Sequence, residues 1–405
     1  LCTKGLCWFP PLMGRPASKR KCPTCGQDGL KRNGTRNGKV RWRCTKCGAT
    51  SSKTRLDVTQ SAEFDLFQAY IGGKNSQALV DQTATGRSLR RRLAWCWKVP
   101  VPRPSPTGEI YDQVFLDGTH LGYNWVLLTA VNQDGLVIAW QWASGENAAA
   151  YTALIKDLAP PKVVTVDGAS GALKAIRKVW GEETALQRCL IHVHRNNRED
   201  LTLHPKTMAG KSLLALSRAL LKITTKEQAS HWEALLQAFY NQYATYLKER
   251  TFAKDNPEEG LKRGRTWWYT HDRDRRVYFR LARLARQGVL FTYLNAELAQ
   301  GLHSTTNIVE SLNSLIDDLC YQHRGLSEPH QICAVNWLLH HHTELPTPTR
   351  QILKQWKQTG KPTAQLVPAK TPKPTPKPGP KQYDTGLTAE EGLWPRKGWA
   401  GRWQP

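Results

Sequence analysis

Gln113-Val-Phe-Leu-Asp117-Gly-Thr119 sets the fold class of this chain, and Val163-Val-Thr-Val-Asp167-Gly-Ala169 repeats its pattern. Each stretch is a short apolar run of the kind that forms a buried strand, and each delivers a carboxylate at or near the end of that strand. A third carboxylate, Glu310, lies in Ser304-Thr-Thr-Asn-Ile-Val-Glu-Ser-Leu-Asn313, which has the periodicity of a helix. Two strand aspartates and a helical glutamate suit a hard divalent cation such as Mg2+, and without a cation the three anions repel one another.

The segments around the two aspartates predict a mixed α/β layer. Strands are expected at 125–132 and 136–142, joined by a turn at 133–135, and again at 185–192; helices are expected at 147–158 and 171–180. Three antiparallel strands followed by helix, strand, helix and strand differ from a doubly wound dinucleotide fold. The sequence also lacks a glycine-rich phosphate-binding motif, so we expect no nucleotide cofactor.

A long helical segment separates the second aspartate from Glu310. Helical periodicity marks residues 212–223, 226–249 and 274–287, so residues 196–300 are expected to form an all-α insertion into the core. Within it, Arg265, Trp267 and Trp268 combine a cation with aromatic rings, which suits stacking on unpaired bases. A tryptophan-rich core between helices explains the same rings equally well.

The charge of the chain points to a polyanionic partner. The formal net charge is +25 over 405 residues, and residues 1–105 hold 21 Lys and Arg against 5 Asp and Glu. A basic excess of this size is typical of proteins that bind nucleic acid. No apolar run long enough for a transmembrane helix and no secretion signal is seen, so we expect no membrane association.

Two Cys-x-x-Cys pairs, separated by eighteen residues, predict a zinc ribbon with a structural Zn2+. The expected ligands are Cys22, Cys25, Cys44 and Cys47. A pair of unrelated reduced dithiols is the alternative. The segment between the pairs reads as a basic hairpin whose expected DNA contacts are Lys39, Arg41 and Arg43, although some ribbons bind proteins instead.

The next segment predicts a helix-turn-helix. A helix ends at Gly72-Gly73, a second helix is expected at 76–82, and a turn leads into an arginine-rich helix in which Leu89, Leu93 and Trp97 recur every four residues. The arginines left on the other side are expected to enter the DNA major groove: Arg87, Arg90, Arg91 and Arg92. A small helical bundle with a solvated charged face is the alternative.

These segments predict a domain order along the chain. The chain starts with Leu1, and Met13 looks like a more natural start, so residues 1–14 are interpreted as an upstream extension. The remaining boundaries are a zinc ribbon at 15–57, a helix-turn-helix at 58–99, a proline-rich linker at 100–108, a core at 109–195 and 301–345, the insertion at 196–300, and a basic proline-rich disordered tail at 346–405.

Together these motifs resemble the mutator-like branch of bacterial insertion-sequence transposases, over about residues 15–345. The resemblance rests on Asp117-Gly-Thr-His120, on Val166-Asp-Gly-Ala-Ser-Gly-Ala-Leu-Lys-Ala175, on Gln187-Arg-Cys-Leu-Ile-His192 and on Thr305-Thr-Asn-Ile-Val-Glu-Ser-Leu-Asn313. It implies an α/β fold with a ribonuclease-H-like mixed sheet, an all-α insertion, and the zinc ribbon and helix-turn-helix in front.

The resemblance also implies a reaction. Asp117, Asp167 and Glu310 would be the catalytic residues and would bind two Mg2+ or Mn2+ ions, about 3.5–4 Å apart, for hydrolysis at the ends of an insertion sequence and transfer of the 3′-OH ends to target DNA. The implied partners are double-stranded DNA, at the terminal inverted repeats and at the target, and at least one further copy of the chain. The implied location is the bacterial cytoplasm, on the nucleoid.

Three further residues belong to the motifs of the resemblance: Cys189, His192 and Asn307. On a strand, Cys189 and His192 would face opposite sides, so we expect Cys189 to pack in the core and His192 to touch DNA or a neighbouring carboxylate. Two other functions stay open. One is a zinc-ribbon and helix-turn-helix regulator whose carboxylates do not act, and the other is a nuclease of the same fold that does not join ends.

Overall fold

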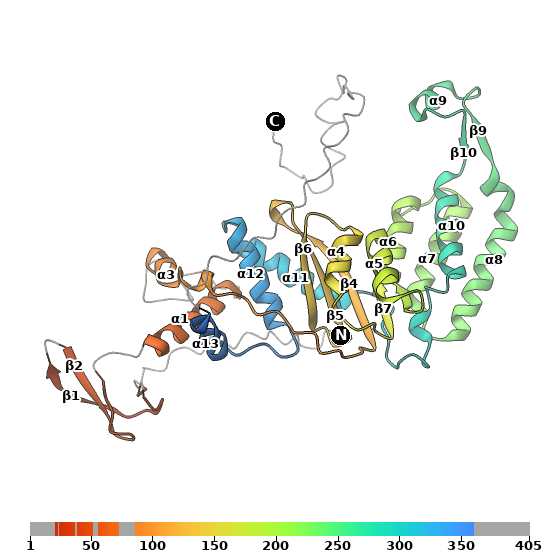
Figure 1. Ribbon diagram of the computed structural model, residues 1–405. Coiled ribbons are helices and arrows are strands. Elements are labelled where there is room, and N and C mark those ends of the chain that lie inside the picture. The colour runs from red at the N-terminus through yellow and green to blue at the C-terminus, as the bar shows by residue number, and fades with distance from the viewer. Residues whose placement is uncertain (1–20, 23, 37–38, 52–55, 73–85, 360–405) are drawn as a thin grey trace. The chain divides into compact units, whose positions relative to one another are not determined.

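The structure is a computed structural model that describes residues 21–22, 24–36, 39–51, 56–72 and 86–359 (Figure 1). The side chains of residues 36, 39 and 56–58 fall outside this description. So do the expected upstream extension at 1–14, the expected helix at 76–82 and everything after residue 359.

A mixed five-stranded sheet with the strand order β6-β5-β4-β7-β8 forms the centre of the fold. Its strands are β4 (Gln113–His120), β5 (Val126–Asn132), β6 (Val137–Ala143), β7 (Val163–Val166) and β8 (Ala185–Arg188). β4 runs antiparallel to β5 and parallel to β7, and β7 runs parallel to β8. The mixed α/β layer is therefore confirmed. The strand expected at 185–192 was wrong in its second half, because the chain turns into a helix after Arg188.

Helices cover both faces of this sheet. On one face, α4 (Ala148–Ile155) and α5 (Ser170–Trp180) pack against Val114 and Leu116 of β4. On the other face, α11 (Asn307–Gln322) and α12 (Glu328–His341) share a hydrophobic cluster with Phe115. Because successive strand residues point to opposite faces, Asp117 falls on the α11 side and Gly118 on the α4 side.

The N-terminal helices share the hydrophobic cluster on the α11 side. The N-terminal elements are α1 (Leu56–Gly72), α3 (Gly86–Leu93) and the 3-10 turn η1 (Cys96–Lys98). The C-terminal helix α13 (Thr349–Gln358) joins the same cluster. Phe64 of α1 and Leu89 of α3 are buried in that cluster, and the Phe64 ring meets Trp337 of α12 edge-on at 5.2 Å between centroids. Within the described residues, the segment expected as a helix-turn-helix therefore has no core of its own. The tail expected to be disordered from residue 346 instead contains α13.

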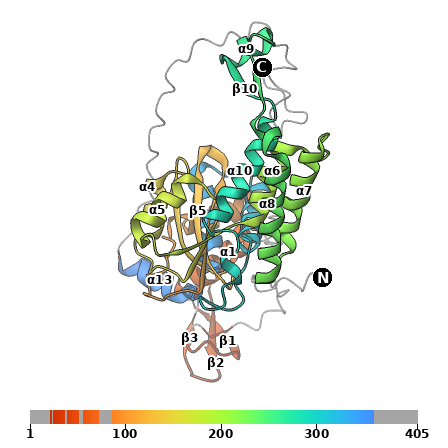
Figure 2. The ribbon, with the colours of Figure 1, turned by 90° about the vertical axis from the view of Figure 1, so that its right-hand side faces the viewer.

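A helical bundle with a separate core lies between β8 and α11 in the chain (Figure 2). Its elements are α6 (Leu190–Leu201), α7 (Met208–Ala219), η3 (Leu220–Lys222), α8 (Lys226–Lys248), β9 (Arg250–Phe252), α9 (Pro257–Arg263), β10 (Trp267–Tyr269), α10 (Asp272–Arg286) and η4 (Thr292–Leu294). The segment that the sequence predicts to be an all-α insertion is mostly helical, but its all-α character was wrong, because β9 and β10 pair as an antiparallel hairpin around α9.

The N-terminal cysteine segment forms a three-stranded antiparallel sheet of β1 (Leu30–Arg36), β2 (Lys39–Cys44) and β3 (Thr50–Ser51). The short turn η2 (Gly122–Asn124) connects β4 to β5. Among the described residues, no helix has the length and apolarity that a membrane span needs.

Candidate active site

Asp117 and Asp167 are neighbours because their strands are neighbours. β4 and β7 pair in parallel, and their last paired residues are Leu116 and Val166. Asp117 directly follows Leu116, and Asp167 directly follows Val166. Asp117 is 9% exposed and lies within β4, which continues to His120 against β5, whereas Asp167 directly follows β7. Two carboxylates thus meet at one edge of the parallel part of the sheet.

The Asp117 carboxylate is buried and has one strong hydrogen-bond donor. Asn313 of α11 donates from Nδ2 to Asp117 Oδ2 at 2.8 Å. Burial, and after it the negative charge of Asp167, raises the pKa of Asp117 to about 6. The other side-chain atom of Asn313, Oδ1, is a buried acceptor that lacks a hydrogen-bond partner among the described residues. Sequence reasoning did not assign Asn313 to the site, although it lies one helical turn after Glu310.

The chain around Asp167 is held by Arg188, the last residue of β8. Arg188 Nη2 donates to the backbone oxygen of Asp167 at 2.6 Å, and the backbone N–H of Ala169 donates to Asp167 Oδ1 at 2.8 Å. Gly168 between them has φ 101°, and a side chain there would overlap the Arg188 guanidinium. Sequence reasoning missed Arg188, because nothing in the motif says that its side chain turns back toward Asp167.

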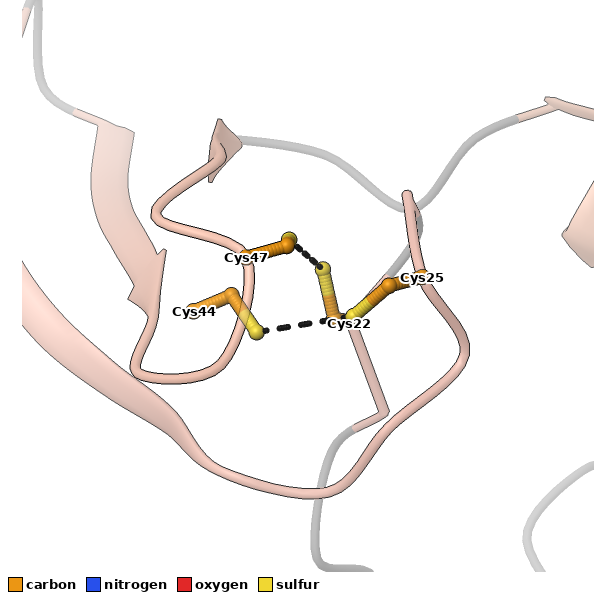
Figure 3. Close-up of side chains that lie close together, drawn as sticks. All are labelled: Cys22, Cys25, Cys44 and Cys47. Carbon is orange, nitrogen blue, oxygen red and sulfur yellow. Dashed lines mark hydrogen bonds between the residues drawn. The ribbon is translucent and has the colours of Figure 1, made fainter.

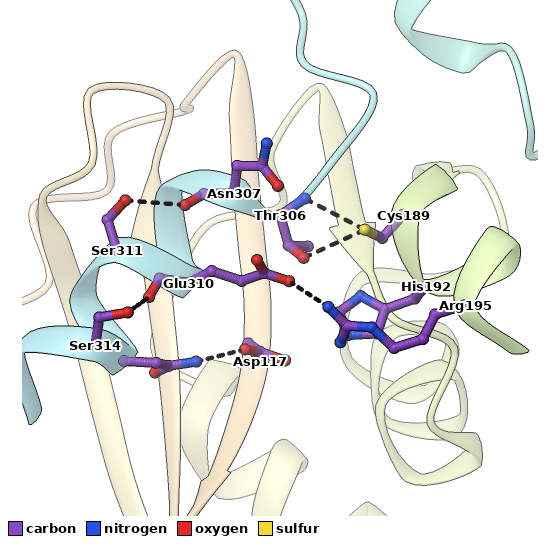
Figure 4. Close-up of polar contacts among 10 residues, drawn as sticks. Asp117, Cys189, His192, Arg195, Thr306, Asn307, Glu310, Ser311 and Ser314 are labelled. Carbon is purple, nitrogen blue, oxygen red and sulfur yellow. Dashed lines mark hydrogen bonds and ion pairs between the residues drawn. The ribbon is translucent and has the colours of Figure 1, made fainter. Parts of the chain in front are cut away.

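Glu310 comes to the same edge from the first turn of α11 (Figure 4). Its Oε1 is 3.6 Å from Arg195 Nη2 of α6, and its side chain is 38% exposed. The three predicted carboxylates therefore lie around one edge but do not form a closed set. Within the described residues, only the N-terminal cysteines bring three or more possible ligand atoms within 4.8 Å of one another.

The Cys189–His192 pair lies at the start of α6, so the prediction that both lie on a strand was wrong. Cys189 precedes the first residue of α6, is 0% exposed, and its sulfur accepts from the backbone N–H and the hydroxyl of Thr306 at 3.3 Å each. This contact joins the start of α6 to the start of α11 (Figure 4). We call the end of the sheet where Asp117, Asp167 and Glu310 lie the acidic edge. The pKa of His192 is raised by the Cys189 sulfur and then by the charges of Asp117 and Asp167, so His192 faces the acidic edge.

Two more side chains complete the description of this edge. Asn307, the first residue of α11, has an exposed side chain. Glu146, in the loop before α4, is a further carboxylate that sequence reasoning missed. Burial and the charge of Asp167 raise the pKa of Glu146, and its Oε1 is 3.4 Å from His120 Nε2.

These residues fit a divalent cation. Asp117 is a buried carboxylate next to a second negative charge, and the Asn313 Oδ1 atom beside it is an unused oxygen donor. Carboxylate and amide oxygens are the ligands that Mg2+ and Mn2+ prefer. The local repulsion between Asp117 and Asp167 is the kind that a bound cation relieves.

The four cysteines form a second candidate metal site (Figure 3). Their sulfurs lie within 4.8 Å of one another, with Cys22 to Cys47 at 3.6 Å and Cys25 to Cys44 at 3.7 Å. The backbone N–H groups of Thr24 and Lys46 point at the sulfurs of Cys22 and Cys44, both at 3.4 Å. The backbone N–H of Cys25 is the main cause that lowers the pKa of Cys22 to about 6. The cluster is compatible with the zinc ribbon predicted from the spacing.

The basic residues expected to bind DNA differ in accessibility. Arg87, Arg90 and Arg91 of α3 are exposed, whereas Arg92 is half-buried. In the ribbon, Arg43 is exposed and Arg41 is half-buried beside Thr50, and the Lys39 side chain lies outside the described residues. The exposed cations of α3 and the ribbon thus stay candidates for DNA contacts.

Trp267 and Trp268, which the sequence predicts to stack on unpaired bases or to fill a core between helices, both lie on β10. Trp268 is 8% exposed with the Arg263 guanidinium over its ring at 5.1 Å, and the Arg250 guanidinium lies over Trp267 at 4.2 Å. Arg265 is exposed at the start of this strand.

Comparison with known proteins identifies one relationship. Residues 110–254 match the family model described as Transposase, Mutator family. The matched region contains both aspartates, Glu146, Cys189 and His192, while Glu310 lies beyond it. No curated protein matches the chain. The match confirms the resemblance to mutator-like insertion-sequence transposases and supports a transposase, an enzyme that binds and processes DNA.

Proposed function

We propose that this protein is a DNA transposase of a bacterial insertion sequence. It binds the terminal inverted repeats of its element, cleaves at the ends and joins the 3′-OH ends to target DNA. The observation that carries this proposal is the position of Asp117 and Asp167 directly after Leu116 and Val166, the last paired residues of the parallel strands β4 and β7. Both aspartates lie inside the region that matches the Mutator family, and Asn313 of α11 donates to Asp117. The arrangement supports a ribonuclease-H-like core.

Each residue has a distinct part in the proposed chemistry. Asp117, Asp167 and Glu310 hold two divalent cations, Mg2+ or Mn2+, which when bound stabilise charge on the phosphate and lower the pKa of water. Asn313 fixes the rotamer of Asp117 through its 2.8 Å hydrogen bond. Arg188 fixes the backbone at Asp167. Arg195 pairs with the Glu310 carboxylate at 3.6 Å without a cation, and Glu310 leaves this pair when it binds one. Preorganised ligands of this kind lose little freedom when the substrate binds.

DNA recognition is proposed for the N-terminal part of the chain. The zinc ribbon supplies a stable basic hairpin, and α3 presents Arg87, Arg90 and Arg91 to solvent. Phosphate contacts from such cations give affinity, and an arginine that reaches a base edge in the major groove gives sequence preference. Two ends must be held at once, so the active form is proposed to contain at least two copies, acting on the nucleoid in the cytoplasm.

The proposal is tested by cleavage and strand transfer on labelled DNA that carries the ends of the element. In the presence of Mg2+ or Mn2+, the wild-type protein is expected to nick and join these ends. Asp167→Ala is expected to lower the rate by roughly 10³-fold or more, because metal-ion stabilisation is worth several kcal/mol. DNA binding should persist. The matched control is Asp157→Asn, whose exposed carboxylate on the C-terminal side of α4 pairs only weakly with Lys156.

The two alternatives give different products. Cleavage without joined ends would indicate a nuclease of the same fold. Binding without any cleavage by the wild-type protein, even with Mn2+, would indicate a DNA-binding regulator and would contradict the proposed transposase.

A further inference from the structure

Glu146 lies in the connection between β6 and α4, directly before Asn147. The Asn147 side chain caps α4 by accepting from the backbone N–H of Ala150 at 2.9 Å. This cap fixes where the helix starts, and therefore fixes the backbone that carries Glu146. The residue is 23% exposed at its side chain, so it lies in a partly closed position rather than on an open loop.

Two glycines, one after each catalytic aspartate, make room for this segment. A Cβ atom at Gly118 would lie 2.6 Å from Glu146 Oε1 and 2.8 Å from its Cδ. A Cβ atom at Gly171 would lie 3.0 Å from the Glu146 backbone oxygen and 2.9 Å from the Asn147 carbonyl carbon. The carboxylate therefore rests on the strand next to Asp117, and the backbone of its loop rests on the first turn of α5. The Glu146 side chain therefore fills the space at Gly118, and the backbone of residues 146–148 fills the space at Gly171.

This placement brings Glu146 to the acidic edge from the other side of the sheet. Gly118 faces the α4 side, while Asp117, Asn313 and Glu310 meet on the α11 side. The negative charge of Asp167 acts on both Asp117 and Glu146. The Glu146 carboxylate thus lies against Gly118, the residue after Asp117, on the face of β4 opposite to the Asp117 side chain.

The structural explanation for Glu146 is its contact with His120. That contact is 3.4 Å long and involves a histidine side chain that is 75% exposed. An exposed ion pair contributes about 0–1 kcal/mol. It is too weak to account for a partly buried carboxylate whose pKa is raised by burial and by the charge of Asp167.

We propose that Glu146 is a fourth carboxylate of the divalent-cation site, and that it contributes to cation binding together with Asp117 and Asp167. The proposal rests on the proposed function, since it concerns the same cations. Glu146 adds negative charge next to Gly118, on the α4 side of the sheet, whereas Glu310 comes from α11 on the other side. It acts either on the cation directly or through a water that the cation holds, and both raise the affinity for the cation.

The test measures Mn2+ binding to the full-length protein without DNA, by electron paramagnetic resonance of the free ion. Glu146→Gln keeps the shape of the side chain and removes its charge. We expect the Mn2+ dissociation constant to rise about 10-fold or more, within the range found when groups supporting a metal site are changed. Asp167→Asn is the positive control, and Asp157→Asn is the matched carboxylate control, expected to bind Mn2+ like the wild type.

Two further variants separate cation binding from a structural role. Gly118→Ala keeps the Glu146 charge but pushes its carboxylate aside. As a single variant it is expected to weaken Mn2+ binding, and added to Glu146→Gln it is expected to weaken binding no further. His120→Gln removes the contact with His120 and is expected to leave Mn2+ binding unchanged. If Glu146→Gln fails to fold, which circular dichroism would reveal, Gly118→Ala alone still tests the proposal.

The outcomes are distinguishable. Wild-type Mn2+ affinity in Glu146→Gln, with weakened binding in Asp167→Asn, overturns the role of Glu146 and leaves the proposed function standing. Equal Mn2+ binding in both variants and the wild type overturns the cation site itself, and the role of Glu146 with it. Weakening by His120→Gln to the same extent as by Glu146→Gln also overturns the proposal, because the ion pair would then be the whole effect.

Discussion

The cysteine cluster and the acidic edge are two candidate metal sites built in opposite ways. The four cysteines come from residues 22–47, and their sulfurs already lie within 4.8 Å of one another. The carboxylates come from residues between 117 and 310, and they meet only because β4 pairs with β7 and α11 packs on the sheet. One site depends on local spacing and the other on the topology of the whole core.

The two sites also differ in how complete they are. A set of four thiolates fills the tetrahedral positions of Zn2+, which is the arrangement of structural zinc. At the acidic edge, Glu310 is turned to Arg195, and Asn313 keeps a buried oxygen without a partner among the described residues. A site that leaves positions for substrate and water suits catalysis, so this difference agrees with the proposal that one site is structural and the other catalytic.

The largest expected effect is the removal of zinc. Chelation, or Cys44→Ser, is expected to unfold the ribbon, because structural Zn2+ contributes about 10–16 kcal/mol to the folding of small zinc domains. Binding to the ends of the element should then be lost, while Mn2+ binding at the acidic edge should persist. Gel-shift and Mn2+ titrations on the same sample measure both.

The control for the zinc experiment is Cys320→Ser, which changes a half-buried cysteine of α11 outside the cluster. It should retain DNA binding. If zinc removal abolished Mn2+ binding as well, the two sites would not be independent, and the contrast between them would fail.

An intermediate effect is expected from pH. The pKa of Asp117 is raised from its ordinary value near 3.8 to about 6, so the folded protein without cations holds this proton more tightly than the unfolded chain. The stability from this group is present below pH 4 and is lost as pH rises through 6. Asp117→Asn cannot ionise and is expected to be more stable than the wild type at pH 7, by at most about 3 kcal/mol.

Urea unfolding at pH 4, 5, 6 and 7, without divalent cations, measures this difference. The advantage of Asp117→Asn should shrink toward pH 4, where the wild-type carboxyl is protonated. An advantage that stays constant over this range would show that repulsion at the acidic edge is not its source.

The smallest expected effect comes from the contact between Arg195 and Glu310. Both side chains are more than a third exposed, so the ion pair is worth only about 0.2–1 kcal/mol. Arg195→Gln frees Glu310 for the cation and is expected to tighten Mn2+ binding by about two- to fivefold. Arg198→Gln, one turn further along α6, is the control. Weaker Mn2+ binding in Arg195→Gln would mean that the ion pair positions Glu310 rather than restrains it.

The parts of the site that the sequence predicted are those fixed by local patterns. The short apolar runs predicted that Asp117 and Asp167 lie at or near the ends of buried strands, and the structure has Asp117 within β4 and Asp167 directly after β7. Helical periodicity predicted a helix at Glu310, as the structure has it. Whether these three residues act in catalysis stays a prediction. The Cys-x-x-Cys spacing gave the cysteine cluster, because all four ligands lie in one short segment.

The parts that were missed depend on long-range packing. The apolar residues after Gln187 fit a strand or a helix equally well, and the contact of Cys189 with Thr306 favours the helix start. Arg188 approaches Gly168, and Glu146 approaches Gly118, only because these two residues have no side chain, and no single-residue pattern shows that approach. The packing of α1 against α12 through Phe64 and Trp337 is likewise a tertiary contact that no local pattern predicts.

That shared cluster has a consequence for how the protein is made. α1 and α3 leave the ribosome before α11, α12 and α13, which cover the same apolar residues. Until residues 307–358 have been synthesised, the N-terminal helices lack the partners that bury Phe64 and Leu89. α3 and the α11 helix that carries Glu310 therefore reach their final packing in the same late step. A chain that lacks residues 307–358 carries the α3 arginines without the completed core.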